Sequence, residues 1–311
     1  PPGGERAHAV EGIDVDVAAG EVVCLVGESG SGKSTIALVA MGLLPPALRV
    51  VAGRVGVGGA DVVGASEPRL AALRGVRMAM VFQEPATALN PLMRCGDQVD
   101  EVLAAHTRDG AAARRRRALA AMREAGIDDP ARIHAAWPHA ISGGERQRVM
   151  IAILLIRAPA LLIADEPTTA LDVTTQAQIL ALVRRLARER GMGVLFITHD
   201  FGVVAEVADR VVALRRGRIV ESGARDEVLA HPRDPYTRML LASVPSLVPP
   251  ARAPVEGPLV LETRALGKTW PVRGTWTRTA AFVACADVDL ALRRGEVVGL
   301  VGESGSGKST V

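Results

Sequence analysis

Cysteine and long apolar runs are scarce in this chain of 311 residues. The three cysteines, Cys24, Cys95 and Cys285, lie far apart, which argues against a disulfide framework and against a zinc site. This usage predicts a reducing, cytoplasmic setting. The longest apolar stretch, residues 149–164, is interrupted by an arginine and a proline. No segment therefore reaches the roughly 18 apolar residues that a membrane-spanning helix needs.

Lysine is also scarce. Of the 37 lysine and arginine residues, only Lys33, Lys268 and Lys308 are lysines. Arginine and lysine can replace each other on most surfaces and differ in function only at special sites. The positions that keep lysine in this arginine-rich chain are therefore candidate functional positions. The net charge of +3 is too small and too dispersed to indicate nucleic-acid binding. Hydrophobic residues make up 49% of the chain, which is typical of a packed globular protein.

A ten-residue sequence occurs twice. Residues 26–35 read VGESGSGKST, and residues 301–310 repeat the same letters 275 positions later. The residues just upstream match as well, which indicates a duplication on the scale of a domain. Because the second copy ends directly after its motif, we expect the chain to be part of a longer protein. We expect a first domain at residues 1–243, a proline-rich and semi-rigid linker at 244–258, and the N-terminal part of a second domain at 259–311.

Short apolar segments alternate with helical patterns over residues 1–243. The apolar segments are continuous rather than alternating with polar residues, as is typical of strands buried on both faces. The order of elements predicts an α/β fold with a mainly parallel sheet. We expect strands at residues 21–26, 78–82, 161–164 and 193–198, and helices at residues 35–44, 97–125 and 142–156.

The first copy of the repeat follows a predicted strand and fits the pattern G-x-x-x-x-G-K-[ST] over Gly27–Ser34. The glycines allow the backbone to wrap a phosphate chain, and the helix that starts here adds the positive end of its dipole. Lys33 supplies a compact positive charge to the β- and γ-phosphates, and Ser34 supplies a hydroxyl for Mg²⁺. The alternative is a glycine-rich turn with an exposed lysine. The strand–loop–helix context and the duplication favour nucleotide binding.

Further polar residues follow other predicted elements. Asp165 suits Mg²⁺ binding through water, and Glu166 suits polarisation of an attacking water. Ser142, followed by two glycines, opens a helix whose N-terminus can bind an anion. Gln83 and His199 each end another predicted strand. Taken alone both are weak evidence, because a lone histidine at such a place is more often structural than catalytic.

In this order and spacing, these elements resemble the nucleotide-binding domain of an ABC ATPase. The resemblance covers nearly all of residues 1–243, and residues 259–311 resemble the start of a second such domain. It implies a P-loop NTPase fold with a RecA-like core and a helical subdomain at about residues 86–158. It also implies hydrolysis of ATP with Mg²⁺, at sites that pair the P-loop of one domain with the signature of the other. The second copy lacks its own Asp-Glu strand and histidine, so we expect little activity from this chain alone.

The resemblance assigns roles to individual residues. Glu166 is the catalytic carboxylate, His199 contacts the γ-phosphate, and Gln83 senses the metal and links to the membrane subunit. Ser34, Gln83 and Asp165 are the metal-site residues, and Asp172 lies at the dimer seam. The signature that acts on the opposite domain's nucleotide consists of Ser142, Gly143, Gly144 and Glu145. The two P-loops bind nucleotide through Gly27, Ser29, Gly30, Gly32, Lys33, Ser34 and Thr35 and through Gly302, Gly305, Gly307, Lys308, Ser309 and Thr310.

The chain departs from the family pattern in two respects. The signature normally begins with leucine and has glutamine in fifth place, where this chain has Ile141 and Glu145. Because the serine and both glycines are intact, we expect activity to be retained. The aromatic residue that stacks on adenine is missing upstream of the first P-loop. Upstream of the second, Trp270 is the best candidate and Trp276 the alternative.

Three segments resemble those of oligopeptide and dipeptide importers, namely Gln83–Pro91, Trp137–His139 and His231–Thr237. Relatives with these marks import dipeptides, oligopeptides, glutathione or nickel, and two domains in one chain resemble the fused form. The resemblance implies a peripheral protein on the cytoplasmic face of the cell membrane. Its implied partners are ABC permease subunits, indirectly an extracytoplasmic solute-binding protein, and the second nucleotide-binding domain of the full-length chain.

Two alternative functions remain open at this point. One is a soluble ABC ATPase of translation or DNA repair, although too few residues separate Gln83 from Ser142 for the long coiled coil of the repair type. The other is an interaction protein that does not hydrolyse ATP. The basic run Arg114–Arg117 is expected to be a solvated helix face, with a contact to a membrane subunit or to lipid headgroups as the alternative.

Overall fold

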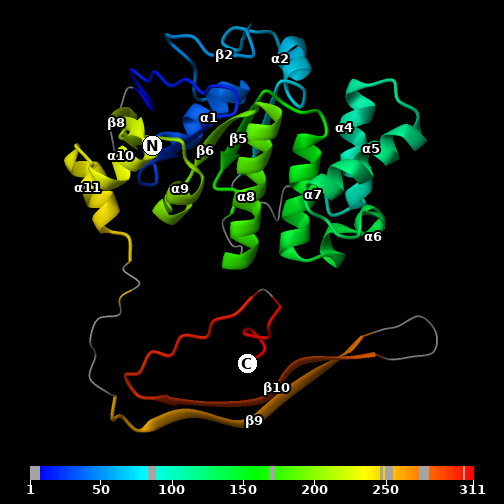
Figure 1. Cartoon of the computed structure of the whole chain (residues 1–311), viewed down its shortest axis with the longest axis vertical. Coiled ribbons are helices and arrows are strands. Elements are labelled where there is room, and N and C mark those ends of the chain that lie inside the picture. The colour runs from blue at the N-terminus through cyan, green and yellow to red at the C-terminus, as the bar shows by residue number, and fades with distance from the viewer. Residues whose placement is uncertain are drawn as a thin grey trace. The chain divides into compact units, whose positions relative to one another are not determined.

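The computed structural model describes residues 8–82, 89–168, 172–245, 248, 255–272, 280–303 and 305–311. The chain divides into two compact units (Figure 1), and each is described by itself. The first unit comprises Pro1–Ala170 and Gln176–Pro245, and the second comprises Leu171–Thr175 and Ser246–Val311.

A six-stranded sheet organises the first unit, with its strands in the order β4-β5-β6-β1-β7-β8. These are β1 (Val22–Val26), β4 (Met78–Val81), β5 (Leu161–Asp165), β6 (Gly193–Ile197), β7 (Arg210–Arg215) and β8 (Arg218–Ala224). Neighbouring strands run parallel up to β7, and β7 forms an antiparallel hairpin with β8. The mainly parallel sheet expected from the sequence is confirmed. A short hairpin joins β2 (Gly56–Val57) to β3 (Ala60–Asp61).

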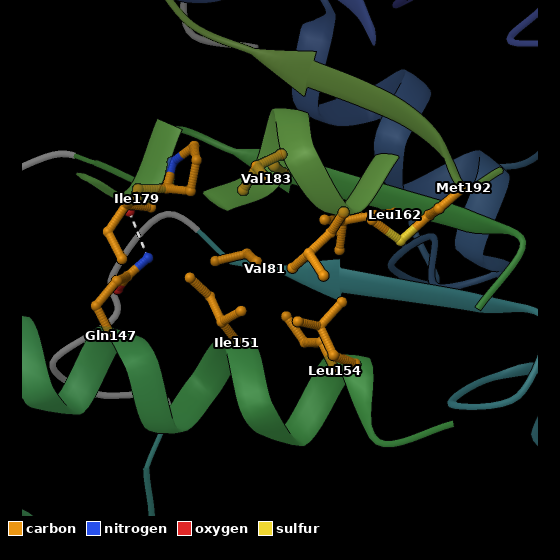
Figure 2. Close-up of a pocket in the computed structure, with 12 residues that line it drawn as sticks. Val81, Gln147, Ile151, Leu154, Leu162, Ile179, Val183 and Met192 are labelled. Atoms are coloured by element: carbon orange, nitrogen blue, oxygen red, sulfur yellow. Dashed lines mark hydrogen bonds between the residues drawn. The ribbon is translucent and has the colours of Figure 1, made fainter. Parts of the chain in front are cut away.

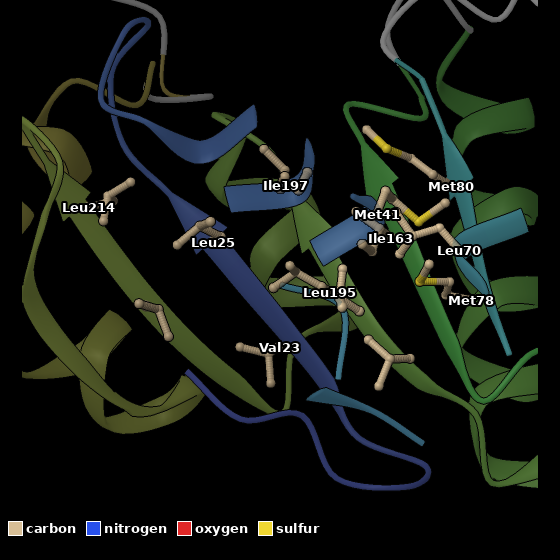
Figure 3. Close-up of a cluster of buried hydrophobic side chains, with 14 residues drawn as sticks. Val23, Leu25, Met41, Leu70, Met78, Met80, Ile163, Leu195, Ile197 and Leu214 are labelled. Atoms are coloured by element: carbon tan, nitrogen blue, oxygen red, sulfur yellow. The ribbon is translucent and has the colours of Figure 1, made fainter. Parts of the chain in front are cut away.

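One face of the sheet packs against α1 (Lys33–Met41) and α2 (Glu67–Leu73). Figure 3 shows this core, where Met41 of α1 lies beside Ile163 of β5 and Leu70 of α2, and the same cluster includes Leu25 of β1 and Leu195 of β6. These side chains come from the central strands, which are buried almost throughout. Burial on both faces explains why the strands have continuous apolar sequences.

The opposite face packs against α7 (Gly143–Leu155) and α8 (Val173–Arg190). Leu162 and Ala164, which alternate with Ile163 along β5, face Ile151 of α7 and Ile179 of α8. Figure 2 shows these side chains around a cavity of about 10 Å³ with an apolar lining. So small an apolar space has no room for a ligand, so this layer is core.

The helical part of the first unit comprises α4 (Cys95–His106), α5 (Ala111–Glu124), α6 (Pro130–Ala135), the 3₁₀ turn η1 (Pro138–Ala140) and α7. α4 packs against α5, α6 and α7. The helical structure expected over residues 97–125 is confirmed, and it consists of two helices, α4 and α5, with a break between them. The Thr107 hydroxyl donates to the Leu103 carbonyl at 2.8 Å and closes α4. The Asp109 carbonyl oxygen accepts a hydrogen bond from the Arg114 guanidinium, and the Asp109 carboxylate accepts one from Arg117, each at 2.6 Å.

The remaining helices of the first unit are α9 (Phe201–Val207), α10 (Arg225–Ala230) and α11 (Pro235–Ala242). α1 is shorter than the helix expected over residues 35–44. It ends at Met41 because Gly42 adopts a left-handed conformation with φ 63° and caps the helix before the prolines that follow. Among the described residues, no helix has both the length and the apolar character required to cross a bilayer.

The second unit is built on an antiparallel pair, β9 (Leu259–Val272) and β10 (Ala280–Arg293). Residues 297–301 repeat the sequence pattern of β1 but do not form a strand, and Val297 and Val301 are 85% and 90% exposed. In the first unit β1 pairs with β6 and β7. A strand is stable only when it has such partners and a packed face.

We predict that Ile163→Ala lowers the free energy of unfolding by about 2–5 kcal/mol, because Ile163 is fully buried where β5 meets α1. The measurement is denaturant unfolding followed by circular dichroism. Leu92→Ala is the control, since Leu92 is 83% exposed and should change stability by no more than about 0.5 kcal/mol. Equal losses for both variants would contradict the assignment of Ile163 to the core.

Candidate functional site

The turn between β1 and α1 requires glycine at several positions. Gly27, Gly30 and Gly32 have φ angles of 149°, 75° and 110°, which residues with a side chain rarely adopt. A Cβ on Gly27 would also lie 2.2 Å from the Leu214 carbonyl oxygen at the end of β7. The loop therefore curls tightly and passes close to β7 before α1 begins at Lys33.

Lys33 closes this loop on itself. Its Nζ donates to the carbonyl oxygens of Gly27 at 2.6 Å and Glu28 at 2.8 Å. The residue is 7% exposed. Burial lowers the pKa of the Lys33 ammonium, and the carboxylates of Glu166, Asp165 and Glu28 oppose this shift. The loop thus encloses a buried positive charge at the place where the sequence predicts a phosphate-binding residue.

Asp165 ends β5 beside this loop. It is 5% exposed, and burial raises its pKa. The Ser34 hydroxyl and the charge of Lys33 lower the pKa, whereas the charge of Glu166 raises it. The net shift of the Asp165 pKa is upward. The fold therefore brings Lys33, Ser34 and Asp165 into one interacting group. Their meeting follows from the sheet, because the carboxyl ends of parallel strands share one edge.

Glu166 and His199 meet at the same edge. The Glu166 N–H donates to the Ile197 carbonyl at 2.9 Å, and Glu166 has a φ of 48°, which is sparsely populated for a residue with a side chain. The ring nitrogen Nδ1 of His199 lies 2.9 Å from Oε1 of Glu166. The Glu166 side chain is 15% exposed and that of His199 is 67% exposed. A mostly buried carboxylate is thus held against a histidine that faces the surface.

Ser142 is the N-cap of α7, as expected, and Glu145 completes a capping box. The Ser142 hydroxyl accepts the Glu145 N–H at 3.2 Å, and Glu145 Oε2 accepts the Ser142 N–H at 2.8 Å. Arg132 pairs with the same carboxylate. Burial raises the pKa of Glu145, but the Ser142 N–H and Arg132 lower it more, so the net shift is downward. The unusual Glu145 therefore holds Ser142 and the two glycines in place.

Gln147 is a site-supporting residue that sequence reasoning did not single out. It is fully buried on α7, and its side-chain amide donates to the Pro167 carbonyl at 2.5 Å (Figure 2). Pro167 directly follows Glu166, so this bond joins the signature helix to the carboxylate loop. A signal did exist in the sequence, because Gln147 stands four residues before Ile151 on the apolar face of the helix.

Gln83 and Asp172 are two further residues that the family resemblance placed in the site. Gln83 lies outside the described residues, so its expected role stays a prediction. Asp172 is described, and its carboxylate accepts both the N–H and the hydroxyl of Thr175, each at 2.9 Å. This pattern is that of a cap at the start of α8, and the place of Asp172 at a dimer seam also stays a prediction.

Comparison with known protein families shows to which family the chain belongs. The family model described as ABC transporter matches residues 10–169 and 285–311, together more than half of the chain. The chain belongs to the ABC transporter family. A second model, described as the C-terminal region of oligopeptide/dipeptide transporters, matches residues 220–270.

Curated relatives within this family are similar over most of the chain. It is 46% identical over 312 residues to the peptidoglycan transport ATP-binding protein YejF of Agrobacterium fabrum, covering 99% of this chain and 57% of the relative. It is 46% identical over 243 residues to the oligopeptide transport ATP-binding protein OppD of Lactococcus lactis subsp. cremoris, covering 78% of this chain and 72% of the relative. The chain thus spans a little over half the length of the Agrobacterium relative.

A solved structure of an ATP-binding cassette supports the same conclusion. That protein is a dimer in a post-hydrolysis state bound to ADP and Pi, and this chain is similar to it with a TM-score of 0.63 and 30% identity. The similarity covers 71% of this chain and 93% of that chain. The predicted ABC-type P-loop NTPase fold is confirmed.

The second copy of the ABC P-loop has the same internal bonds as the first. Lys308 Nζ donates to the carbonyl oxygens of Gly302 and Glu303, each at 2.6 Å. Gly302, Gly305 and Gly307 have positive φ angles of 157°, 83° and 93°. The two loops also have equivalent neighbours. A Cβ on Gly32 would approach the carbonyl oxygen of Ala9, and a Cβ on Gly307 would approach that of Ala284, which is the corresponding residue of the repeat. The P-loop conformation is therefore encoded within the loop and the segment just upstream.

Of the two tryptophans proposed to stack on adenine, Trp270 is described and Trp276 lies outside the described residues. Trp270 lies on β9 and is 50% exposed, and the Lys268 ammonium lies over its ring, 4.5 Å from the ring centroid. The third lysine of the chain thus makes a cation–π contact. Whether either ring stacks on adenine stays a prediction.

We predict that Glu145→Gln weakens the folded state most near neutral pH. The pKa of Glu145 is lower in the folded state than in the unfolded one. Its charge therefore stabilises the fold above the unfolded pKa, and this contribution is lost as pH falls through the folded value. Glutamine keeps the capping geometry but loses the ion pair with Arg132.

The measurement is urea unfolding of wild type and variant at about pH 7 and about pH 3.5. The difference in free energy of unfolding should shrink at the lower pH. Glu189→Gln is the control, because Glu189 is exposed on α8. A difference that is constant with pH would show that the charge of Glu145 does not contribute.

Proposed function

We propose that this chain is the ATP-hydrolysing part of an ABC importer for peptides. The ATPase function rests on the convergence of Lys33, Ser34, Asp165, Glu166 and His199 at one edge of the sheet. Peptide import is supported by the match of residues 220–270 to the oligopeptide/dipeptide transporter C-terminal region and by the transport proteins among the relatives.

ATP is the substrate, and the loop from Gly27 to Ser34 has the chemistry to hold its phosphates. Glycines at positive φ let the loop curl tightly, so backbone N–H groups at the start of α1 can face an anion. The Lys33 ammonium donates hydrogen bonds to neutral oxygens of the loop, namely the carbonyls of Gly27 and Glu28 and the hydroxyl of Ser31. Phosphate oxygens carry more negative charge than these carbonyls and are the stronger partners for it.

Ser34 and Asp165 fit the binding of Mg²⁺. They place a hydroxyl and a carboxylate close enough to interact, and Mg²⁺ prefers such oxygen ligands together with substrate phosphates and water. When bound, the ion would neutralise charge on the phosphates. Gln83 is the further residue that we assign to this group. Burial raises the pKa of the Asp165 carboxylate, and a bound cation would oppose this shift by favouring the charged form.

Glu166 is placed to orient the attacking water. A carboxylate that accepts a hydrogen bond from that water aligns it with the γ-phosphorus, which is the main demand in phosphoryl transfer. His199 lies against Glu166 and can donate a hydrogen bond from its ring to the γ-phosphate. The backbone of Glu166 is left-handed and is held by its hydrogen bond to the Ile197 carbonyl, which fixes the residue at the end of β5.

The full-length protein would pair two domains. Ser142, Gly143 and Gly144 of one domain would contact the γ-phosphate bound by the other, with Asp172 at the seam between them. The second P-loop would be supplied by a second domain in the same chain. Closure on ATP would move permease subunits at the cytoplasmic face of the membrane, and a solute-binding protein would deliver the peptide. A role in translation or DNA repair is not favoured, because the C-terminal match and the relatives are those of transporters.

We predict that Glu166→Gln in the full-length chain binds ATP but hydrolyses it roughly 100- to 10,000-fold more slowly, because the amide orients water poorly. Lys33→Ala should instead weaken ATP binding at the first site. Glu189→Gln on α8 is the matched control, since it makes the same chemical change at an exposed position. Near-normal turnover by the Glu166 variant would refute its catalytic role.

For the transport function we predict ATP-dependent uptake of short peptides. The full-length chain and the membrane proteins that co-purify with it would be reconstituted in proteoliposomes with the solute-binding protein, and uptake of a labelled tripeptide would be followed. The Glu166→Gln protein serves as the negative control. Uptake of glutathione or Ni²⁺ in place of peptides would overturn the peptide assignment. ATPase stimulation by ribosomes without any uptake would overturn import.

A further inference from the structure

The C-terminal helix of the first unit makes direct contact with the P-loop. The Tyr236 hydroxyl on α11 accepts the Glu28 N–H at 2.9 Å, across 208 positions of sequence. Tyr236 is 3% exposed, and it lies in the stretch that matches the oligopeptide/dipeptide transporter C-terminal region. Tyr236 is not among the residues to which a role in ATP binding or hydrolysis has been assigned.

The tyrosine ring is itself held in place. The Arg215 guanidinium lies 4.9 Å from the ring centroid, and the Asp234 carboxylate caps α11 by accepting the Tyr236 N–H at 2.8 Å. Glu221 on β8 accepts the N–H groups of Arg233 at 2.7 Å and Asp234 at 3.1 Å. The segment that carries Tyr236 is thus fastened to the β7–β8 hairpin, and the hydroxyl is presented to the loop in a fixed position.

The bond to Glu28 acts on the peptide group that also holds Lys33. The N–H of Glu28 and the carbonyl of Gly27 belong to one peptide unit, and that carbonyl accepts the Lys33 Nζ at 2.6 Å. Because a trans peptide is planar, its N–H and C=O point in opposite directions. Fixing the N–H therefore fixes the direction of the carbonyl, and with it one of the two main-chain partners of the ammonium.

Tyr236 also satisfies the hydrogen-bonding capacity of this partly buried peptide. An N–H that is shielded from water and has no acceptor is costly, and the Glu28 N–H finds its acceptor on α11. The same hairpin supplies a second support, since the Gly217 N–H donates to the Ser31 carbonyl at 2.7 Å. The first half of the P-loop is therefore held from outside by residues that follow β7, in addition to its own internal bonds.

We propose that Tyr236 is a positioning residue for the nucleotide site, through which the transporter-type C-terminal segment orients the Gly27–Glu28 peptide and hence Lys33. The proposal rests on the proposed ATP-binding function. Without the Tyr236 hydroxyl, the P-loop should spend less of its time in the conformation that binds ATP. ATP affinity should fall, while the chemistry at Glu166 is untouched.

The test compares Tyr236→Phe with Thr237→Val in the full-length chain. Both variants remove one hydroxyl, and Thr237 is as buried as Tyr236 on the same helix. Because the chain has a second P-loop, binding of a fluorescent ATP analogue is measured in a Lys308→Ala background, so that the first site dominates. We expect Tyr236→Phe to raise the Kd roughly 3- to 10-fold, as loss of one hydrogen bond would. Thr237→Val should leave it within about 2-fold.

A second readout separates positioning from stability. Hydrogen exchange of the Glu28 amide should speed up in Tyr236→Phe, whereas the amide of Leu25 in β1 should exchange as in the parent. In otherwise unmodified chains, KM for ATP should rise with kcat nearly unchanged. All measurements are made well below the Tm of the less stable variant, so that a loss of stability does not mimic a loss of affinity.

The outcomes distinguish the two proposals. If the Lys308→Ala parent fails to bind ATP, the proposed function is wrong. If the parent binds and Tyr236→Phe binds equally tightly, or exchanges its Glu28 amide at the parent rate, only the positioning role is wrong. Equal loss of affinity in Tyr236→Phe and Thr237→Val would also overturn it, because α11 would then matter only for folding.

Discussion

The site depends on keeping one positive charge inside the protein. The Lys33 ammonium is almost fully buried and is bonded to two carbonyl oxygens of its own loop. A buried ammonium without such partners would lose its proton or destabilise the fold. The loop must therefore turn its carbonyls inward, which requires the positive φ angles that only glycine adopts easily. The nearby carboxylates Asp165 and Glu166 add the negative charge that opposes deprotonation.

The parallel sheet brings these partners together. Asp165 ends β5 and pairs with Ile197 at the end of β6, and β6 lies between β5 and β1, which leads into the P-loop. Groups separated by more than a hundred residues thus meet without any long-range loop being needed. Glu166 and His199 meet at the same edge over a shorter stretch of chain, because each follows one of two adjacent strands and their side chains touch.

The two P-loops separate local from tertiary contributions. Lys308 makes the same two carbonyl bonds as Lys33, although residues 297–301 form no strand. Closing the loop on its lysine is therefore a local property. The first loop has further supports from the β7–β8 hairpin and α11, among them the Gly217 N–H on Ser31 and the Tyr236 hydroxyl on Glu28. Burial of Lys33 also belongs to this tertiary contribution.

The sequence alone determined the features whose partners lie a few residues apart. Glycine and lysine spacing in Gly27–Ser34 specified the loop, and Ser142 specified the start of α7, because these bonds close within one turn of chain. The Ser-x-x-Glu spacing of a capping box was also readable, although Glu145 first stood out only as a departure from the family pattern. Continuous apolar strands were enough to predict the parallel sheet.

Only the tertiary structure decided which distant residues support the site. A lone histidine became a partner of Glu166, Gln147 became the link to Pro167, and Tyr236 became an acceptor for the P-loop. The physical reason is that a side chain's local sequence fixes its backbone preferences, whereas its hydrogen-bond partner across the fold depends on how the strands are ordered and packed.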